Sequence, residues 1–346
     1  MPWCGIVGVA DVLAGVIYLW GMATLHEPAG LAAELEDKGF IHAPGVFDSA
    51  FMDSLLLRAH ATLFRESADS REQVKSNGSL IHLADNPEYA DVIAAPALNR
   101  LLRDCGASDP RFTGGFLISK PGGGPPLFWH QDWWGWDDDS AYQSRAHQLF
   151  AMIYLTDTTI ENGCLRVIPR SHRLDHLLHH LDMAHSEGMQ RYRDPTNAAY
   201  ADHPDQVAVP VRAGDVLIGD ARLIHGAFAN RSSEERPLLT LWFMPHWNSM
   251  PPEMRALACK GFMRGDDIPS SVTSPSTFLD WPQALKNRIT HLLPPDDGGV
   301  APMCCPIRVL NNSSQMGAGG WGLGDRWLAA GGSGCCLIQL STPRRN

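Results

Sequence analysis

The chain has 346 residues, of which 44% are hydrophobic and 19% are charged, and this balance excludes wholesale disorder. Its formal net charge of −10 at pH 7 argues against a basic surface for nucleic acids. Eight cysteines show no Cys-x-x-Cys spacing, and two pairs of them are adjacent, so we expect free thiols in a reducing, cytoplasmic location.

Residues 1–30 are interpreted as an N-terminal extension. Positions 6–22 are mostly apolar, but Asp11 interrupts them and no basic segment precedes them. The stretch also falls short of the roughly 20 residues that cross a bilayer, so we expect no membrane association. Met22 opens a more ordinary start, MATLHEPAG.

Two helices are expected at the start of the folded region. Apolar residues at helical spacing from Leu31 predict a helix that Gly39 ends, followed by a short strand or loop over 40–47. Ser49 is expected to cap the second helix. Its apolar positions 51, 55, 56, 59 and 63 share one face.

From residue 112 the pattern changes to short strands separated by turn residues. The expected strands span 112–120, 127–132, 147–157, 164–172, two segments of 207–220, 223–230 and 236–247. Many short strands with regular turns predict a mainly β, antiparallel barrel or sandwich. The domain is expected to span 31–293, and the glycine-rich stretch 294–346 is expected to be poorly structured.

An insertion over 173–206 interrupts the strand series and holds five histidines. Such an excursion is either a lid over a site or a solvated surface segment, and the sequence leaves both open. His176, His179 and His180 are interpreted as one helix face, with a second metal site as the alternative.

At four places in the chain, an acidic residue follows a histidine by two positions. Only His130 and Asp132 lie at the end of a convincing strand, where residues i and i+2 point to the same side. The other pairs are His180/Asp182, His185/Glu187 and His203/Asp205. Two histidines and one carboxylate bind Fe(II) on one face, and His225, next to Gly226 in a strand, is the expected third ligand. A strand-end ion pair and a core histidine are the alternatives.

Arg236 is a candidate anchor for an acid. If residues 230–235 form a hairpin, His225 faces Thr240, and Arg236 shares the face of Thr240. Four strand residues cover about 13 Å, which suits a five-carbon diacid between a metal and a guanidinium group. A salt bridge from Arg236 to Glu234 or Glu235 is the alternative. Lys120, at a strand end, is expected to be solvated, with a cofactor role as its alternative.

Four ordered blocks then resemble the phytanoyl-CoA dioxygenase family of Fe(II)/2-oxoglutarate oxygenases. They are WHQD, ENGCLRVIPRSH, GDVLIGDARLIHG and the segment NRS followed by Arg236, within roughly residues 31–250. The resemblance implies a double-stranded β-helix (jelly-roll, cupin-like) fold. It implies iron ligands at His130, Asp132 and His225, and Arg236 on the C5 carboxylate of 2-oxoglutarate. It also implies co-substrate contacts from Phe116, Gln148, Met152 and Thr240.

The resemblance implies an enzyme that uses Fe(II), 2-oxoglutarate and O₂, with ascorbate as support, and releases succinate and CO₂. Relatives that halogenate have a small residue at the position of Asp132, so this chain resembles the hydroxylating branch. Neither the resemblance nor the residues distinguish hydroxylation from desaturation, epoxidation or ring rearrangement.

The expected substrate is a small or medium apolar molecule, such as an intermediate of secondary metabolism. Trp133, Trp134 and Trp136 follow the ligands and either line its pocket or pack in the core. An acyl-CoA is the alternative, with its phosphates bound by Arg166, Arg170, Arg173, Arg191 and Arg193. A non-catalytic metal-binding partner subunit is a further alternative, and a homodimer is left open.

Overall fold

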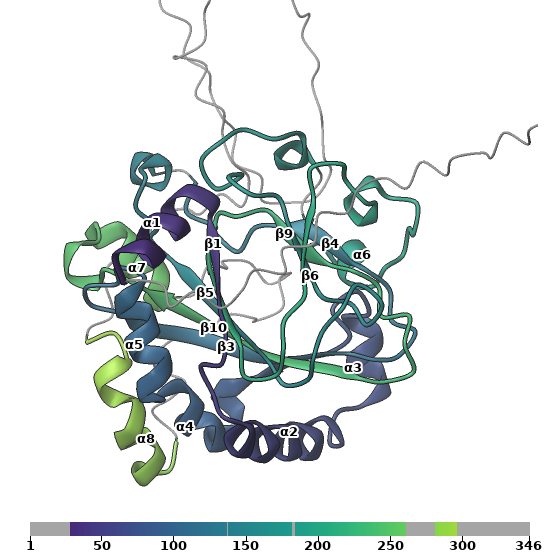
Figure 1. Cartoon of the computed structure of the whole chain (residues 1–346), viewed down its shortest axis with the longest axis horizontal. Helices are drawn as coiled ribbons and strands as arrows, with labels where there is room; N and C mark the ends of the chain where they lie inside the picture. Colours follow the sequence, from purple (N-terminus) through teal and green to yellow (C-terminus); the bar gives the residue numbers. More distant parts are fainter. Residues whose placement is uncertain (1–27, 137, 182–183, 261–280, 296–346) are drawn as a thin grey trace, which may run out of the picture.

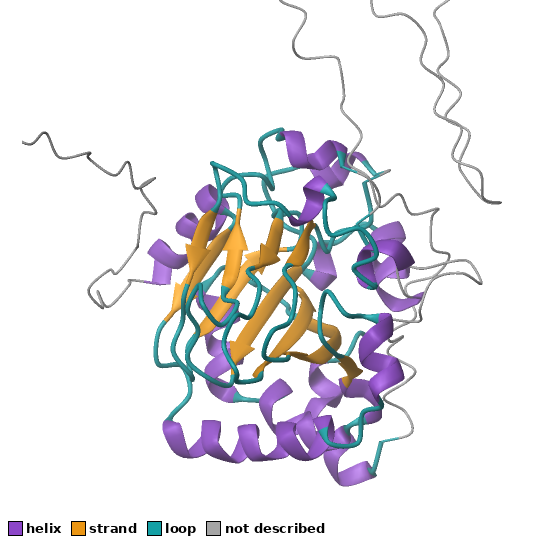
Figure 2. Ribbon diagram, turned by 90° about the vertical axis from the view of Figure 1, so that its right-hand side faces the viewer, coloured by secondary structure: helices purple, strands orange, loops and turns teal. Residues whose placement is uncertain are grey.

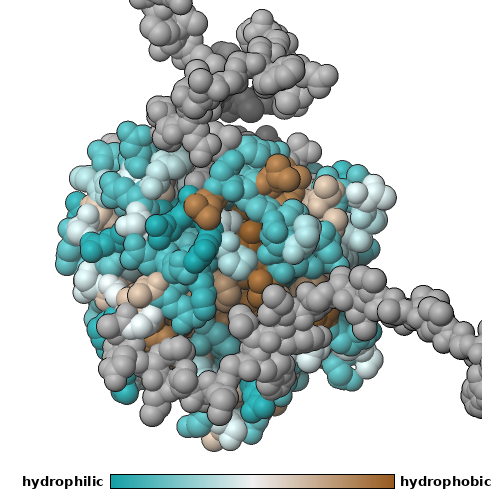
Figure 3. Space-filling model, turned by 45° about the horizontal axis from the view of Figure 1, so that its top comes forward, coloured by the Kyte–Doolittle hydropathy of each residue, from teal (hydrophilic) through white to brown (hydrophobic). Residues whose placement is uncertain are grey.

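The computed structural model describes residues 28–136, 138–181, 184–260 and 281–295. The apolar stretch 6–22 and the glycine-rich stretch from 296 onward lie outside these residues. Within the described ranges, no helix combines the length and the apolar character that a membrane crossing needs. On the face drawn in Figure 3, the described surface is largely hydrophilic, with apolar side chains gathered near its centre.

Two antiparallel sheets form the centre of the fold, as the sequence predicted (Figures 1 and 2). One sheet has six strands in the order β1 (Phe40–Ala43), β8 (Val216–Asp220), β5 (Leu149–Tyr154), β10 (Arg236–Met244), β3 (Arg111–Lys120) and β2 (Leu80–His82). The other has four in the order β4 (Leu127–His130), β9 (His225–Ala227), β6 (Leu165–Val167) and β7 (Val207–Val209). This is the predicted jelly-roll fold, and residues of both sheets line one internal cavity.

Helices cover the outer face of the six-stranded sheet. The largest apolar cluster joins residues of this sheet, such as Ile153 and Leu239, to Leu55, Leu98 and Ile289 on the helices. Figure 1 shows these helices grouped beside β3 and β10. The helices that contribute to this cluster are α1 (Pro28–Lys38), α2 (Ser49–Leu63), α4 (Ala90–Ile93), α5 (Pro96–Asp104) and α8 (Gln283–Ile289). By contrast, α3 (Ala68–Gln73) has no buried residue, and α7 (Pro252–Lys260) packs in a separate apolar cluster.

The predicted ends of the first two helices are close to the observed ones. Gly39, with a φ of +87°, follows α1 and ends it, as expected. The cap of α2 is Asp48 rather than Ser49. The Asp48 carboxylate accepts a hydrogen bond from the Phe51 backbone N–H at 2.8 Å, and Ser49 is the first helical residue.

The hairpin that we expected between His225 and Arg236 is wrong, because β9 and β10 belong to different sheets. The connecting run 230–235 forms a turn with internal hydrogen bonds, such as that from the Asn230 side-chain amide to the Glu234 carbonyl oxygen at 2.7 Å, and it is also held by the loop that follows β3. Asn230 donates its backbone N–H to the Gly124 carbonyl oxygen at 2.9 Å, and its side-chain amide donates to the Lys120 carbonyl oxygen at 3.1 Å.

The insertion 173–206 packs against β4 and contains η4 (Leu177–His180), α6 (Glu187–Gln190) and η5 (Ala198–Tyr200). The buried Arg166 guanidinium joins the two parts. It donates to the Leu127 carbonyl oxygen of β4 at 3.1 Å and to the carbonyl oxygens of Tyr200 and Ala201 at 3.1 and 3.2 Å. Phe128, Met189 and Tyr200 share one apolar cluster. The insertion is therefore partly core rather than wholly solvated.

Gly219 provides a test of the packing behind the cavity. It is the Cα partner of Phe150 across β8 and β5, and an added Cβ would overlap the Phe150 ring, which lies 5.0 Å from the His225 ring centroid. We expect Gly219→Ala to lower the free energy of unfolding by about 1–3 kcal/mol in urea titrations. In the control Gly30→Ala, at an exposed position of α1 with no atom within 4 Å of the new Cβ, we expect a gain of about 0.5–1 kcal/mol. Equal stability of the two variants would contradict this account.

Candidate metal centre

His130 and His225 face each other across two paired strands. His130 ends β4, His225 begins β9, and the two are direct Cα partners with ring centroids 4.2 Å apart. Asp132 follows at the turn, where its backbone N–H donates to the Ala221 carbonyl oxygen at 2.8 Å. One Asp132 carboxylate oxygen lies 3.6 Å from Nε2 of His130 and the other lies 3.8 Å from Nε2 of His225. The three predicted ligands thus come together.

Local hydrogen bonds prepare both imidazoles for a metal. Nδ1 of His130 lies 3.0 Å from the Phe128 carbonyl oxygen, and Nδ1 of His225 lies 3.0 Å from the Leu223 carbonyl oxygen. Because a carbonyl oxygen only accepts, each Nδ1 carries the proton and each Nε2 keeps its lone pair. Burial also holds the pKa of His130 well below its ordinary value, which favours the neutral, ligating form. These donors suit a divalent iron ion.

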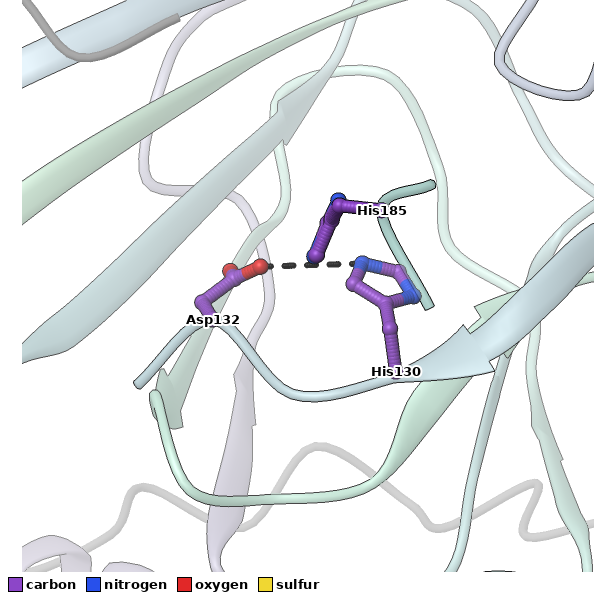
Figure 4. Close-up of side chains that lie close together, drawn as sticks. All are labelled: His130, Asp132 and His185. Carbon is purple, nitrogen blue, oxygen red and sulfur yellow. Dashed lines mark ion pairs between the residues drawn. The ribbon is translucent and has the colours of Figure 1, made fainter. Parts of the chain in front are cut away.

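A third histidine, which the sequence analysis did not place here, reaches the same centre from the insertion. One ligand atom each from His130, Asp132 and His185 lie within 4.8 Å of one another (Figure 4). The His185 ring centroid is 5.1 Å from that of His130 and 5.3 Å from that of Trp134. Burial lowers the pKa of His185, so its imidazole is neutral near pH 7. The only sequence signal was its spacing from Glu187, which gave no reason to join it to β4.

A cavity of about 130 Å³ adjoins these residues and is lined by residues of both sheets. Thr240 of β10 is the Cα partner of Phe116 in β3 and of Met152 in β5, so these three predicted contacts lie side by side on its wall. Gln148 also lines the cavity. Oγ1 of Thr240 and Oε1 of Gln148 are buried without a hydrogen-bond partner among the described residues. The cavity therefore offers unpaired polar atoms to a bound molecule.

Arg236 lies four residues before Thr240 on β10, on the same face of the strand, and its side chain is buried. Its Nε and Nη1 have no hydrogen-bond partner in the part of the chain that the structure describes. The alternative of a salt bridge with a neighbouring glutamate fails for Glu235, which pairs with Arg71 at 2.7 Å. An unpaired buried guanidinium is costly, so its two free N–H groups fit the carboxylate of a small acid.

Lys120 is buried, and the expectation that it is solvated is wrong. It is the Cα partner of Arg236, and its Nζ donates to the carbonyl oxygens of Ser76 at 2.6 Å and Pro125 at 2.5 Å. Burial and the nearby Arg236 charge hold its pKa well below the ordinary value. Lys120 thus ties two loops to the end of β3.

The three tryptophans after the ligands lie in different places. Trp134 lines the cavity. Trp133 and Trp136 are each 2% exposed and pack with Trp247 and Met254 in a separate apolar cluster, so they do not line it. One of the three expected substrate contacts is therefore in position.

The family model for phytanoyl-CoA dioxygenase (PhyH) matches residues 35–238, which is more than half of the chain. The chain belongs to this family. It is accordingly a dioxygenase that uses iron and 2-oxoglutarate, as the resemblance implied.

The chain is similar to two named relatives and to one solved structure. It is 26% identical to the ectoine dioxygenase of Sphingopyxis alaskensis over 58% of its own length and 70% of the relative. It is 27% identical to the phytanoyl-CoA dioxygenase of Arabidopsis thaliana over 47% of its own length and about half, 54%, of that relative. The epimerase SnoN, in complex with Fe³⁺, alpha ketoglutarate and nogalamycin RO, is 22% identical with a TM-score of 0.49, over 72% of this chain and 96% of SnoN.

Loss of His225 tests the metal centre directly. We expect His225→Ala to weaken Fe(II) binding by at least about 100-fold in anaerobic titrations, because even residues that only support metal ligands contribute up to that factor. His60→Ala, on the exposed side of α2, is the control and should bind iron as the native protein does. A His225→Ala protein with native iron content would rule out this residue as a ligand.

Proposed function

We propose that His130, Asp132 and His225 bind Fe(II), and that the enzyme hydroxylates a small or medium-sized apolar molecule of secondary metabolism. One observation carries the proposal: a His-Asp-His set adjoins one cavity, and an unpaired buried guanidinium, Arg236, lies on the same strand face as a residue of its wall. Iron bound there supplies the activation of dioxygen that no side chain of the chain provides.

The residues around the ligands fix their orientation. The Trp242 indole N–H donates to one Asp132 oxygen at 2.9 Å, which holds the carboxylate toward the histidines. The Phe128 and Leu223 carbonyl oxygens hold the two imidazole rings in the same way. Because these partners are fixed before anything binds, the three donors keep one geometry.

The co-substrate is proposed to lie between the metal centre and Arg236. Its C5 carboxylate would accept from the unpaired Nε and Nη1 of Arg236, and its other end would reach the His-Asp-His set. Thr240 and Gln148 offer polar atoms along the way, and Phe116 and Met152 flank them. Burial of these groups strengthens each charged contact relative to one in water.

The charges around the site support a neutral substrate over an acyl-CoA. Arg166 is occupied by backbone carbonyl oxygens. Arg170 pairs with Asp37 at 2.8 Å, and the remaining arginines also have carboxylate partners. Arg173 lies 4.0 Å from Glu36, and Arg191 and Arg193 both pair with Glu187. These five arginines therefore offer no unpaired cluster for phosphates, whereas Trp134, Leu127 and Ile118 give the cavity apolar walls.

A catalytic role is favoured over a non-catalytic metal-binding subunit, because the proposed ligand set and the proposed co-substrate anchor are both complete. A cytoplasmic location is proposed as well, and the free, buried Cys105 and Cys164 support it.

Arg236→Lys tests the co-substrate anchor. It keeps the charge but loses the two-pronged contact, which is worth roughly 1.5–3 kcal/mol, so we expect the KM for 2-oxoglutarate to rise about 10- to 150-fold. Succinate formation without added substrate is the assay. Arg170→Lys, at an exposed pair with Asp37, should leave KM unchanged. Native 2-oxoglutarate dependence in Arg236→Lys would show that the anchor lies elsewhere.

Arg166→Met tests whether the insertion acts as a lid. It removes the bonds between β4 and the end of the insertion, each worth about 1.5–3 kcal/mol for a charged donor, so proteolysis within 173–206 should accelerate about tenfold or more. Substrate-independent 2-oxoglutarate consumption should rise relative to oxidation of an added substrate. Arg193→Met, which loses only its pair with Glu187, is the control. If the insertion has no role in turnover, the proteolysis rate will rise, while the ratio of substrate oxidation to 2-oxoglutarate consumption will stay at the native value.

A further inference from the structure

His185 enters the metal centre from the insertion, whereas the proposed ligands come from β4, β9 and the turn between β4 and the next segment (Figure 4). Ligand atoms around one octahedral ion lie roughly 3.0 to 4.2 Å apart, given metal–ligand distances near 2.1 Å. The ligand atoms of His130, Asp132 and His185 already lie within 4.8 Å of one another. A small shift of one side chain brings His185 into range.

The imidazole of His185 has an unused nitrogen at this point. Its Nε2 is buried and has no hydrogen-bond partner among the described residues, although the side chain lines the cavity. The rings of His130, Phe128 and Trp134 surround it with centroids 5.1, 5.5 and 5.3 Å away. Because buried polar atoms nearly always have a partner, the missing partner of Nε2 points to a bound species.

The segment that carries His185 is tied to the scaffold on its C-terminal side. The Ser76 backbone N–H donates to the Gln190 carbonyl oxygen at 2.9 Å, and the Gln190 side-chain amide donates to the His185 carbonyl oxygen at 3.3 Å. Arg166 holds the far end of the insertion to β4. The approach of His185 to the metal centre is therefore part of the fold.

A second histidine cluster in the insertion differs in the way its nitrogens are used. His176, His203 and Asp205 also lie within 4.8 Å of one another. However, Nδ1 of His176 accepts from the Leu178 backbone N–H at 3.2 Å, and Nδ1 of His203 accepts from the Asp205 backbone N–H at 3.1 Å. Each neutral ring then carries its proton on Nε2, and Nε2 of His176 faces Asp205 at 3.4 Å. This cluster is satisfied by its own hydrogen bonds.

We infer that His185 is a displaceable third imidazole ligand of the metal, bound while the cavity is empty. The inference rests on the proposed function of His130, Asp132 and His225. Those three leave three of six positions, of which 2-oxoglutarate takes two and dioxygen needs the last. His185, as a fourth protein ligand, would occupy that last position. His185 and Gln190 also line the cavity, so a substrate that fills it must meet the same ring and displace it.

The test counts imidazole nitrogens on Cu(II) bound to the full chain without 2-oxoglutarate, by pulsed electron paramagnetic resonance. We expect three in the native protein and in the control His176→Phe, and two in both His185→Phe and His185→Gln. Co(II) affinity should fall about tenfold or more in the two His185 variants. Their 2-oxoglutarate consumption without substrate should rise several-fold, because the position that dioxygen needs stays open.

The outcomes separate this inference from the proposed function. Two imidazoles in the native protein and one in His225→Phe would overturn the role of His185 and leave the proposed ligand set intact. Three imidazoles in His185→Phe would overturn it as well. If His225→Phe keeps the native number and affinity while His185→Phe loses both, His185 is a permanent ligand in place of His225, and both the inference and the proposed ligand set fail.

Discussion

The pairing of β4 with β9 is the constraint on which the site depends, because it sets His130 directly opposite His225. A slip of one residue would turn one histidine to the other face of the sheet. Gly226 permits the close approach: a Cβ at this position would lie 2.9 Å from the Leu127 carbonyl oxygen of β4. The register is irregular between Leu127 and His130, immediately before the turn that carries Asp132. Strand geometry thus holds the two histidines of the proposed ligand set in place before any metal binds.

The two sheets contribute different residues to the site. The four-stranded sheet carries the two paired histidines, and the six-stranded sheet carries the polar wall with Thr240 and the buried Arg236. Arg236 stands opposite Lys120, so two basic side chains are buried together at the end of β3 and β10. Backbone carbonyl oxygens satisfy Lys120, while two nitrogens of Arg236 have no partner among the described residues. A fold that buries an unpaired guanidinium loses stability there, and such local costs are typical of binding sites.

The sequence was most informative where a local rule determines geometry. The His130 and Asp132 side chains do lie within 3.6 Å of each other, although Asp132 is in the turn after β4 and not on the strand as expected. Even spacing on one strand placed Arg236 on the face of Thr240. Prediction from the sequence failed where tertiary contacts determine the path of the chain. Turn residues alone suggested a hairpin after His225, but Asn230 bonds to the loop after β3 and the chain crosses to the other sheet. Likewise, nothing in the residues around Lys120 indicates that two distant carbonyl oxygens bury it, and no pattern indicated the helices between 68 and 104.

The insertion shows why such tertiary contacts matter for function. The scaffold strands can offer the metal two imidazoles and a carboxylate, and that set is common to any substrate. Specificity must come from the rest of the cavity wall, to which the insertion contributes His185 and Gln190. Arg166 holds that insertion to the strand that ends in His130. Because this segment lines the cavity beside the proposed metal ligands, the proposed displacement of His185 would link occupancy of the cavity to access to the metal.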